Sequence, residues 1–280
     1  MSTDFQQARN TLGARLRELR TEAGLTGRQL AGSLGWLPSK VSKLENGKQT
    51  PSVADLDAWA HGVGNPESAV ELKGQLRGFE TRYRSWRRQL ASGHRARQEA
   101  GIVELSQTRV MRGAEFGVIP GIFQTAEYAR AVLTRYVELR GTPKDVEPAV
   151  SARMRRQEAL CESDREFHAL IWEGALRVLI CQPDVLVGQL DRLSGLLGLG
   201  TVSLGIIPFE APLRIAPGDG FWIYDNRLVI SETWNAEMWL DDSTDVALFT
   251  KIWDTLNASA FYGPQAHRLI ARARASLDLA

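Results

Sequence analysis

The sequence predicts an all-α N-terminal domain followed by a mixed α/β C-terminal domain, and three observations indicate this division. Two short amphipathic helical patterns joined by a glycine turn lie between Leu25 and Pro51. Strand-like apolar runs appear from Phe167 onward. Residues 1–112 hold 18 Lys and Arg against 11 Asp and Glu, whereas residues 113–280 hold 16 against 22. A basic front part therefore precedes an acidic back part.

The length of 280 residues predicts two domains. We expect them at residues 1–66 and 113–280, with residues 67–112 as a helical connector. No apolar run approaches the roughly 18 to 20 residues that span a bilayer, and the N-terminus lacks the apolar core of a signal peptide. The two cysteines, Cys161 and Cys181, fit a reducing compartment. These features predict a cytoplasmic protein.

The front domain begins with a helix that we expect from Leu12 to Ala23, because leucines recur there at helical spacing. Thr26 can cap a second helix, and Gly35 can take the left-handed conformation that ends it. A turn of about three residues then leads to Pro38, which suits the first position of a third helix.

The third helix has one apolar and one polar face. Val41 and Leu44 fall three residues apart and are expected to point inward. The outward residues are Ser39, Lys40, Ser42 and Lys43. Hydroxyl groups can bond to base edges or phosphates, and a lysine can reach guanine or a phosphate. The pattern therefore predicts a helix-turn-helix whose third helix enters the major groove of DNA.

The fourth helix follows a loop in which Lys48 and Gln49 are placed to touch phosphates. We expect Thr50 to cap this helix and Pro51 to open it. Its inner face is predicted to be Val53, Leu56 and Ala60.

These residues resemble the Xre/Cro-type helix-turn-helix over roughly Leu12 to Val63. The matching features are LT at the start of the second helix, A and LG within and after it, and SKVSKLENGKQTPS from the third helix into the next loop. The resemblance implies a five-helix, lambda-repressor-like domain that binds an operator in double-stranded DNA. The DNA-binding residues that we predict are Arg28, Gln29, Pro38, Ser39, Lys40, Ser42, Lys43, Lys48, Gln49 and Thr50.

Two positions depart from the family pattern. Many relatives carry Gln at position 27 and a hydroxyl cap at position 37, where this chain has Gly27 and Leu37. Arg28 is placed to take over the phosphate contact that a glutamine would make. Leu37 leaves the third helix without a side-chain cap, which costs about 1 kcal/mol.

A longer helix is expected from Pro66 to Leu90, with apolar residues spaced four, three, four, three and four apart. This is the period of a coiled-coil seam. The seam consists of Leu72, Leu76, Phe79, Tyr83, Trp86 and Leu90. Two interpretations remain open: the helix packs on its own chain, or it forms the contact of a homodimer.

The back half is predicted to alternate helices and strands. We expect a helix from Arg95 to about Gly113, strands at Phe167–Trp172, Leu176–Ile180 and Val202–Ile207, and a β-hairpin that turns at Asp225 and Asn226. The sequence of the back half resembles the C-terminal domain of actinobacterial regulators that carry an Xre-type N-terminal domain. The matching segments are IPGIFQTAEYARAVL, RMRRQEAL, WEGALR, QLDRL and VSLGIIPF. Such regulators are described as antitoxin-like or developmental, and the resemblance implies a small acidic partner protein.

No catalytic pattern is present in the sequence. The four histidines are scattered, neither cysteine lies at metal-ligand spacing from another donor, and no G-x-S-x-G, Walker or HExxH motif occurs. We therefore expect no enzyme activity, cofactor or metal.

Three functions remain to be weighed. The first is a homodimeric transcriptional regulator whose back half dimerises and receives a signal from a small protein or ligand, and which lies on the nucleoid when bound to DNA. The second is an antitoxin-like protein that neutralises a small partner and regulates its own gene. The third, an enzyme fused to a DNA-binding head, is disfavoured by the missing motifs.

Overall fold

The computed structural model describes the backbone of residues 3–80 and 83–277, and the side chains of residues 8–76, 78 and 84–277. The chain divides into two compact units, Met1–Tyr83 and Arg84–Ala280. We call them unit 1 and unit 2 and describe each by itself.

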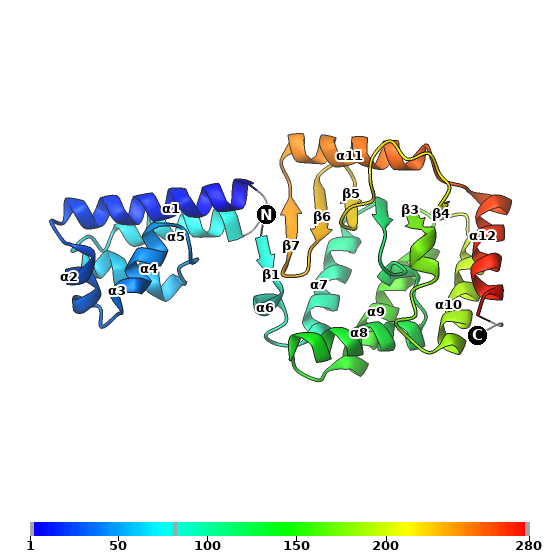
Figure 1. The fold of residues 1–280 in the computed structure, drawn as a ribbon, viewed down its shortest axis with the longest axis horizontal. Helices are drawn as coiled ribbons and strands as arrows, with labels where there is room; N and C mark the ends of the chain where they lie inside the picture. Colours follow the sequence, from blue (N-terminus) through cyan, green and yellow to red (C-terminus); the bar gives the residue numbers. More distant parts are fainter. Residues whose placement is uncertain (1–2, 81–82, 278–280) are drawn as a thin grey trace. The chain divides into compact units, whose positions relative to one another are not determined.

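Unit 1 is helical, as predicted. Its described helices are α1 (Thr3–Glu22), α2 (Gly27–Ser33), α3 (Pro38–Glu45), α4 (Val53–Gly62) and α5 (Ser68–Glu80), coloured blue to cyan in Figure 1. Thr26 caps α2 in a capping box, because its hydroxyl accepts from the Gln29 amide and the Gln29 side chain accepts from the Thr26 amide. Gly35 has a φ of 66°, so the turn between α2 and α3 uses the left-handed conformation that the sequence predicts.

One hydrophobic core joins the five helices of unit 1. Its buried members are Leu12, Leu16, Leu19, Leu30, Ala31, Val41, Leu44, Leu56, Trp59, Val63, Leu72 and Leu76. Trp59 is fully buried, and its Nε1 donates to the carbonyl of Leu16 at 3.2 Å. The indole therefore fixes α4 to α1 by packing and by a hydrogen bond.

The start of α4 differs from the prediction. Ser52 caps the helix instead of Thr50: its hydroxyl accepts from the Asp55 amide at 3.1 Å, and the Asp55 carboxylate accepts from the Ser52 amide at 3.0 Å. Serine and aspartate three residues apart make a reciprocal cap that Thr50 cannot match. Val53, which we expected on the inner face, is 46% exposed, whereas Leu56, Trp59 and Ala60 are buried.

The single helix predicted from Pro66 to Leu90 is wrong. Helix α5 ends at Glu80, and strand β1 (Tyr83–Ser85) and helix α6 (Trp86–Gln89) follow. The regular spacing of the apolar residues gives a wrong prediction because these residues belong to two separate cores. Leu72 and Leu76 are buried in unit 1, whereas Leu90 is buried in unit 2.

The remaining seam residues give no continuous stripe either. Trp86 belongs to unit 2, where its Nε1 donates to the carbonyl of Thr233 at 2.8 Å. The side chains of Phe79 and Tyr83 lie outside the described residues. The boundary between the units therefore falls inside the segment 67–112 that we expected to be a connector.

Unit 2 is built on a seven-stranded mixed sheet in the order β1-β7-β6-β5-β2-β3-β4. Its further strands are β2 (Val110–Glu115), β3 (Glu166–Trp172), β4 (Val202–Ile207), β5 (Phe221–Tyr224), β6 (Leu228–Glu232) and β7 (Ala236–Leu240). Strands β2, β3 and β4 are parallel, β5 is antiparallel to β2 and β6, and β7 is antiparallel to β6. The mixed α/β class expected for the back half is confirmed.

Some of the predicted elements of unit 2 are confirmed, including the strand at Phe167–Trp172, and others are wrong. The hairpin between β5 and β6 turns at Asp225, which has a φ of 52°. Strand β4 has the predicted bounds. By contrast, the predicted strand Leu176–Ile180 is absent, since a short 3-10 helix, η3 (Glu173–Leu176), and a loop occupy that stretch. The helix expected from Arg95 to Gly113 ends early, because Val110 starts β2 beside β3.

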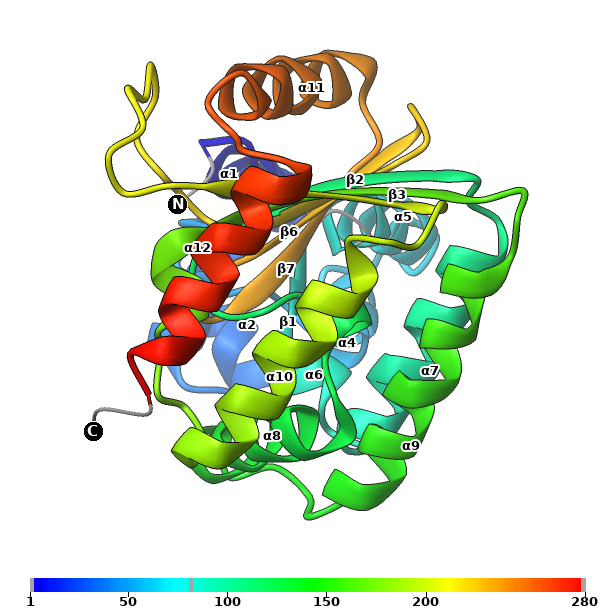
Figure 2. The ribbon, with the colours of Figure 1, turned by 90° about the vertical axis from the view of Figure 1, so that its right-hand side faces the viewer.

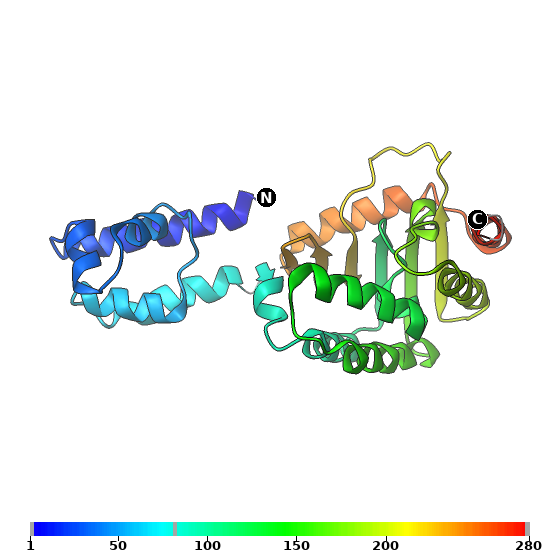
Figure 3. The same ribbon diagram turned by 60° about the horizontal axis from the view of Figure 1, so that its bottom comes forward.

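Helices cover both faces of this sheet. They are α7 (His94–Ser106), α8 (Ala126–Arg140), α9 (Val146–Arg156), α10 (Pro183–Leu196), α11 (Ser243–Asn257) and α12 (Gly263–Ala275), with the short helices η1 (Gly121–Phe123) and η2 (Gln157–Cys161). Figure 2 shows α11 on one side of the sheet and α7, α9 and α10 on the other. Figure 3 shows α8 and α9 side by side.

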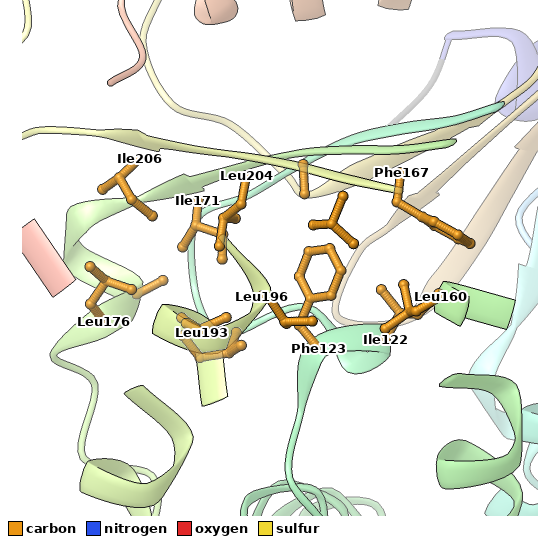
Figure 4. Packing of buried hydrophobic residues seen from close by; sticks show 14 of the residues in the cluster. Ile122, Phe123, Leu160, Phe167, Ile171, Leu176, Leu193, Leu196, Leu204 and Ile206 are labelled. Carbon is orange, nitrogen blue, oxygen red and sulfur yellow. The ribbon is translucent and has the colours of Figure 1, made fainter. Parts of the chain in front are cut away.

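The largest core of unit 2 lies between β3, β4 and the helices α10 and α12. Figure 4 shows Phe167, Ile171, Leu204 and Ile206 of the sheet above Leu193. A second cluster, on the face that α11 covers, contains Val246 and Trp253. The largest core also includes Tyr224 of β5 and Leu228 and Ile230 of β6.

Candidate nucleic-acid interface

Helix α3 presents the polar face that the sequence predicts. Val41 and Leu44 are each 1% exposed and lie in the core. Ser39, Ser42 and Lys43 are exposed. The outer face of α3 therefore offers two hydroxyls and one ammonium group, which fits contact with base edges and phosphates.

The C-terminal end of α3 is fastened to α1 by a carboxylate. Glu45 is 9% exposed. It accepts from Arg20 Nε at 2.5 Å and Nη2 at 3.1 Å, and from Arg17 Nε at 3.3 Å. The hydrogen bond with Glu45 raises the pKa of Arg20 although burial opposes the change. A two-point contact of this kind fixes orientation as well as distance.

The N-terminal end of α3 is fastened to α4. Lys40 Nζ lies 2.6 Å from Asp55 Oδ1 and 3.9 Å from the centre of the Trp36 ring. Burial acts to raise the pKa of Asp55, but hydrogen bonds from Lys40 and Ser52 and the Lys40 charge outweigh it, so that the pKa is lowered. The charge of Lys40, which we predicted to face DNA, is thus engaged within the domain.

Loop residues after α3 lie beside its end. The backbone amides of Lys48 and Gln49 both donate to the Lys43 carbonyl, at 2.8 and 3.2 Å. Both residues are exposed, whereas Thr50 is only partly exposed. The structure therefore brings Lys48 and Gln49 together with Lys43.

The other predicted contacts lie at the two helix starts. Arg28 and Pro38 are exposed, at the beginnings of α2 and α3. Gln29 is exposed too, and its side-chain oxygen is already used in the capping box. Leu37 makes no side-chain cap, as predicted, and is 74% exposed.

The positioning residues Arg20, Glu45 and Asp55 were not predicted. Arg20 lies 25 residues before Glu45. A charged residue in an amphipathic helix gives no local signal that its partner lies in another helix. The sequence pattern indicates only that Glu45, next to the core residue Leu44, is buried.

Neither metal nor membrane features occur in the part of the chain that the structure describes. No group of three His, Cys, Asp or Glu residues there is placed to hold a metal ion. No described helix is long and apolar enough to cross a membrane. Cys161 and Cys181 are free thiols.

Comparison with protein families matches both parts of the chain. The model of a helix-turn-helix domain matches residues 11–72, which include α2 and α3. The model of the domain of unknown function DUF5753 matches residues 102–272. The chain belongs to the DUF5753 family. In this DUF5753 protein the family domain accounts for most of unit 2, and the helix-turn-helix domain lies in unit 1.

Two solved structures have a distant similarity to this DUF5753 protein. NucT from Helicobacter pylori shares 10% identity with a TM-score of 0.36, over 61% of this chain and 92% of that chain. The archaeal chromatin protein TrmBL2, whose structure is described as showing a novel mode of DNA binding, shares 13% identity with a TM-score of 0.34, over 75% of this chain and 69% of that chain. No curated protein sequence matches the chain.

Proposed function

We propose that this protein is a sequence-specific transcriptional regulator of the Xre type, which reads an operator with the exposed face of α3. The observation that carries the proposal is the polar face of α3, fastened at one end by Glu45 and at the other by Lys40. A rigid helix with small polar residues outward can enter a major groove in one register. The helix-turn-helix family match supports the same function.

We further propose that the protein acts as a homodimer and by binding alone, without catalysis. A single helix-turn-helix offers few base contacts, and dimers place two recognition helices about 34 Å apart, one turn of the duplex. Unit 2 then dimerises and receives the signal, from a small protein or a ligand. The test is genome-wide footprinting with the full chain, in which paired half-sites one turn apart are expected. Single, unpaired sites would contradict the dimer.

An antitoxin-like role makes a different prediction for purification. A regulator that responds to a ligand is expected to purify alone, whereas an antitoxin is expected to purify with an equimolar amount of a small protein. Mass spectrometry of the natively purified protein distinguishes the two. Footprinting with and without a small protein encoded by a neighbouring gene then shows whether that protein changes operator binding.

Replacing Lys43 with alanine is expected to relax base preference at one operator position. The side chain is exposed on the face of α3 that bears Ser39 and Ser42, so it is placed to reach a base edge. A lost base contact costs about 1 to 3 kcal/mol of discrimination at that position. Binding to a set of operators with single base changes measures the effect. An equal loss on operator and random DNA would assign Lys43 to phosphate contact instead.

Replacing Lys48 with alanine is expected to weaken binding evenly across sequences. Lys48 is exposed in the loop after α3, and a phosphate contact carries no sequence information. The slope of log K against log salt should fall by about one. Lys251→Ala, at an exposed position on α11, is the matched control and should change neither quantity. An unchanged salt slope in Lys48→Ala would show that the loop does not reach the backbone.

A further inference from the structure

Unit 2 contains charged side chains between its sheet and the helices α7 and α9. Residues alternate between the two faces of a strand, so Glu115 lies on the same face as Met111, and Glu232 on the same face as Ile230. Arginines of α7 and α9 lie opposite. We call this set the charged cluster; it consists of Arg97, Arg153, Arg156, Glu115, Glu232 and Glu237.

One ion pair in the charged cluster is complete. Glu237 is 0% exposed and accepts from Arg97 Nε at 2.6 Å and from Trp239 Nε1 at 3.1 Å. Burial acts to lower the pKa of Arg97, and the Glu237 carboxylate more than offsets it. The charges of Arg97 and Glu237 therefore balance each other.

Two other carboxyl groups of the charged cluster lack a cationic hydrogen-bond partner. Glu115 accepts from Trp222 Nε1 at 2.8 Å, and burial, followed by the charge of Glu232, raises its pKa to about 8. Glu232 lies opposite Glu237 in the β6–β7 ladder, and its carboxylate accepts no hydrogen bond from a residue that the structure describes. Burial and then the charge of Glu237 raise the pKa of Glu232.

Solvent reaches part of the charged cluster. Glu232 is exposed, and Glu115, Arg153 and Arg156 are each partly exposed. A small molecule can therefore reach these side chains from the solvent.

The two arginines of α9 have no carboxylate bonded to them. Arg153 donates to two neutral amide oxygens, Gln98 Oε1 at 3.1 Å and Gln124 Oε1 at 2.5 Å. Burial, followed by the charge of Arg156, lowers the pKa of Arg153 to about 9. The two amides accept from Nε and Nη1 of Arg153 but leave its charge without a bonded counter-ion.

Arg156 is the least satisfied member of the charged cluster. Its Nε is buried without a hydrogen-bond partner, and no described residue makes a hydrogen bond to its guanidinium. Burial is the first cause that lowers its pKa. The guanidinium lies against two glycines: a Cβ on Gly101 would be 2.8 Å from Nη1, and a Cβ on Gly121 would be 3.1 Å from Nη2. A buried cation without a hydrogen-bonded counter-ion destabilises the folded protein unless another group binds to it.

The bonding within the cluster favours an anion. Arg97 is bonded to Glu237, whereas neither Arg153 nor Arg156 is bonded to a carboxylate of a residue that the structure describes. Arg156 Nε is a buried donor without a partner, beside side chains that are partly exposed to solvent. Planar guanidinium groups match the oxygen atoms of carboxylates and phosphates.

We propose that the charged cluster is the binding site of a small organic anion, whose carboxylate or phosphate group lies against Arg153 and Arg156. Glu115 and Glu232, on the sheet, then accept hydrogen bonds from polar groups of the same molecule or donate hydrogen bonds to them. Trp222, which is partly buried on this face of the sheet and bonded to Glu115, provides an apolar side of the site. The site lies within unit 2 and does not depend on DNA binding.

The test is thermal unfolding of the full chain with inorganic phosphate or citrate, at constant ionic strength set with chloride. Either anion is expected to raise Tm by about 3 to 6 °C at ten times its Kd. The two arms distinguish a phosphate-selective site from a carboxylate-selective one. No rise with either anion would overturn the proposal.

Arg156→Met supplies the decisive comparison. Without anion its Tm should rise, because an uncompensated charge is removed, and the response to anions should be lost. Arg192→Met, at an exposed position of α10, is the matched control and should keep the full response. Gly101→Ala keeps the charge but displaces the guanidinium, and should reduce the response on a folded protein. A lower Tm of anion-free Arg156→Met, or an undiminished response in both variants, would show that Arg156 is structural and overturn the proposal.

Discussion

Replacing Gly13 with valine is expected to destabilise unit 1 by about 3 kcal/mol and to weaken operator binding. A Cβ at this position of α1 would lie 2.6 Å from the carbonyl oxygen of Glu45 and 2.7 Å from that of Leu44. Both atoms belong to the backbone at the end of α3, so they cannot move aside without shifting the helix. The clash would also displace Glu45 from Arg20, and the recognition helix would lose its fastening to α1.

Gly74→Val in α5 is the matched control, because a Cβ there meets nothing within 4 Å. It should leave stability nearly unchanged, since valine and glycine differ by only a few tenths of a kcal/mol in helix propensity. Hydrogen exchange of peptides from α1 and α3, together with gel-shift affinity for the operator, measures both effects. A Gly13→Val protein with wild-type exchange and affinity would show that the α1–α3 contact is not close enough to position α3.

The helix-turn-helix was predictable because its signals are local. The capping residue Thr26, the turn at Gly35 and the inward pair Val41 and Leu44 all act within a few residues of their place in the chain. Spacing and capping therefore predict α2 and α3 correctly. The hairpin at Asp225 was predictable for the same reason. By contrast, α1 begins at Thr3 instead of Leu12, and the predicted cap of α4 and length of α5 were wrong.

The predictions that failed concern residues whose partners lie far away in the sequence. The apolar residues from Leu72 to Leu90 recur with a regular period, yet Leu76 and Leu90 are buried in different units. Periodicity reports that a residue will be buried, and it does not report in which core. Strand β2 was missed because its hydrogen-bonding partners, β3 and β5, come much later in the chain.

The charged cluster gave no signal in the sequence for a related reason. The hydrogen bond between Arg97 and Glu237 joins residues 140 positions apart. An arginine in RMRRQEAL looks like part of a solvated helix face, and only the fold turns Arg153 and Arg156 toward the sheet. We therefore infer that ionic sites inside α/β units are found from the contacts of the folded chain and seldom from motifs.

Replacing Arg97 with methionine is expected to destabilise unit 2 by about 3 to 5 kcal/mol. Glu237 is 0% exposed, and after the change only Trp239 Nε1 would still donate to it. The cross-strand neighbour Glu232 would add a second negative charge beside it. An uncompensated carboxylate in the interior is far more costly than the loss of the pair as a whole. Chemical denaturation, followed by hydrogen exchange of peptides from β6 and β7, measures the loss.

The double variant Arg97→Met/Glu237→Leu tests the reason for the loss. If the cost comes from the unpaired carboxylate, removing that carboxylate should restore most of the stability, because two apolar side chains replace a buried ion pair at little net cost. The pair is completed within the fold, so its single replacement should destabilise the protein, whereas Arg156→Met, at a guanidinium without a bonded partner, should not. A double variant as unstable as Arg97→Met would mean that the methylene groups and packing of Arg97 stabilise unit 2, and that the charge of Glu237 is already balanced by Arg153 and Arg156.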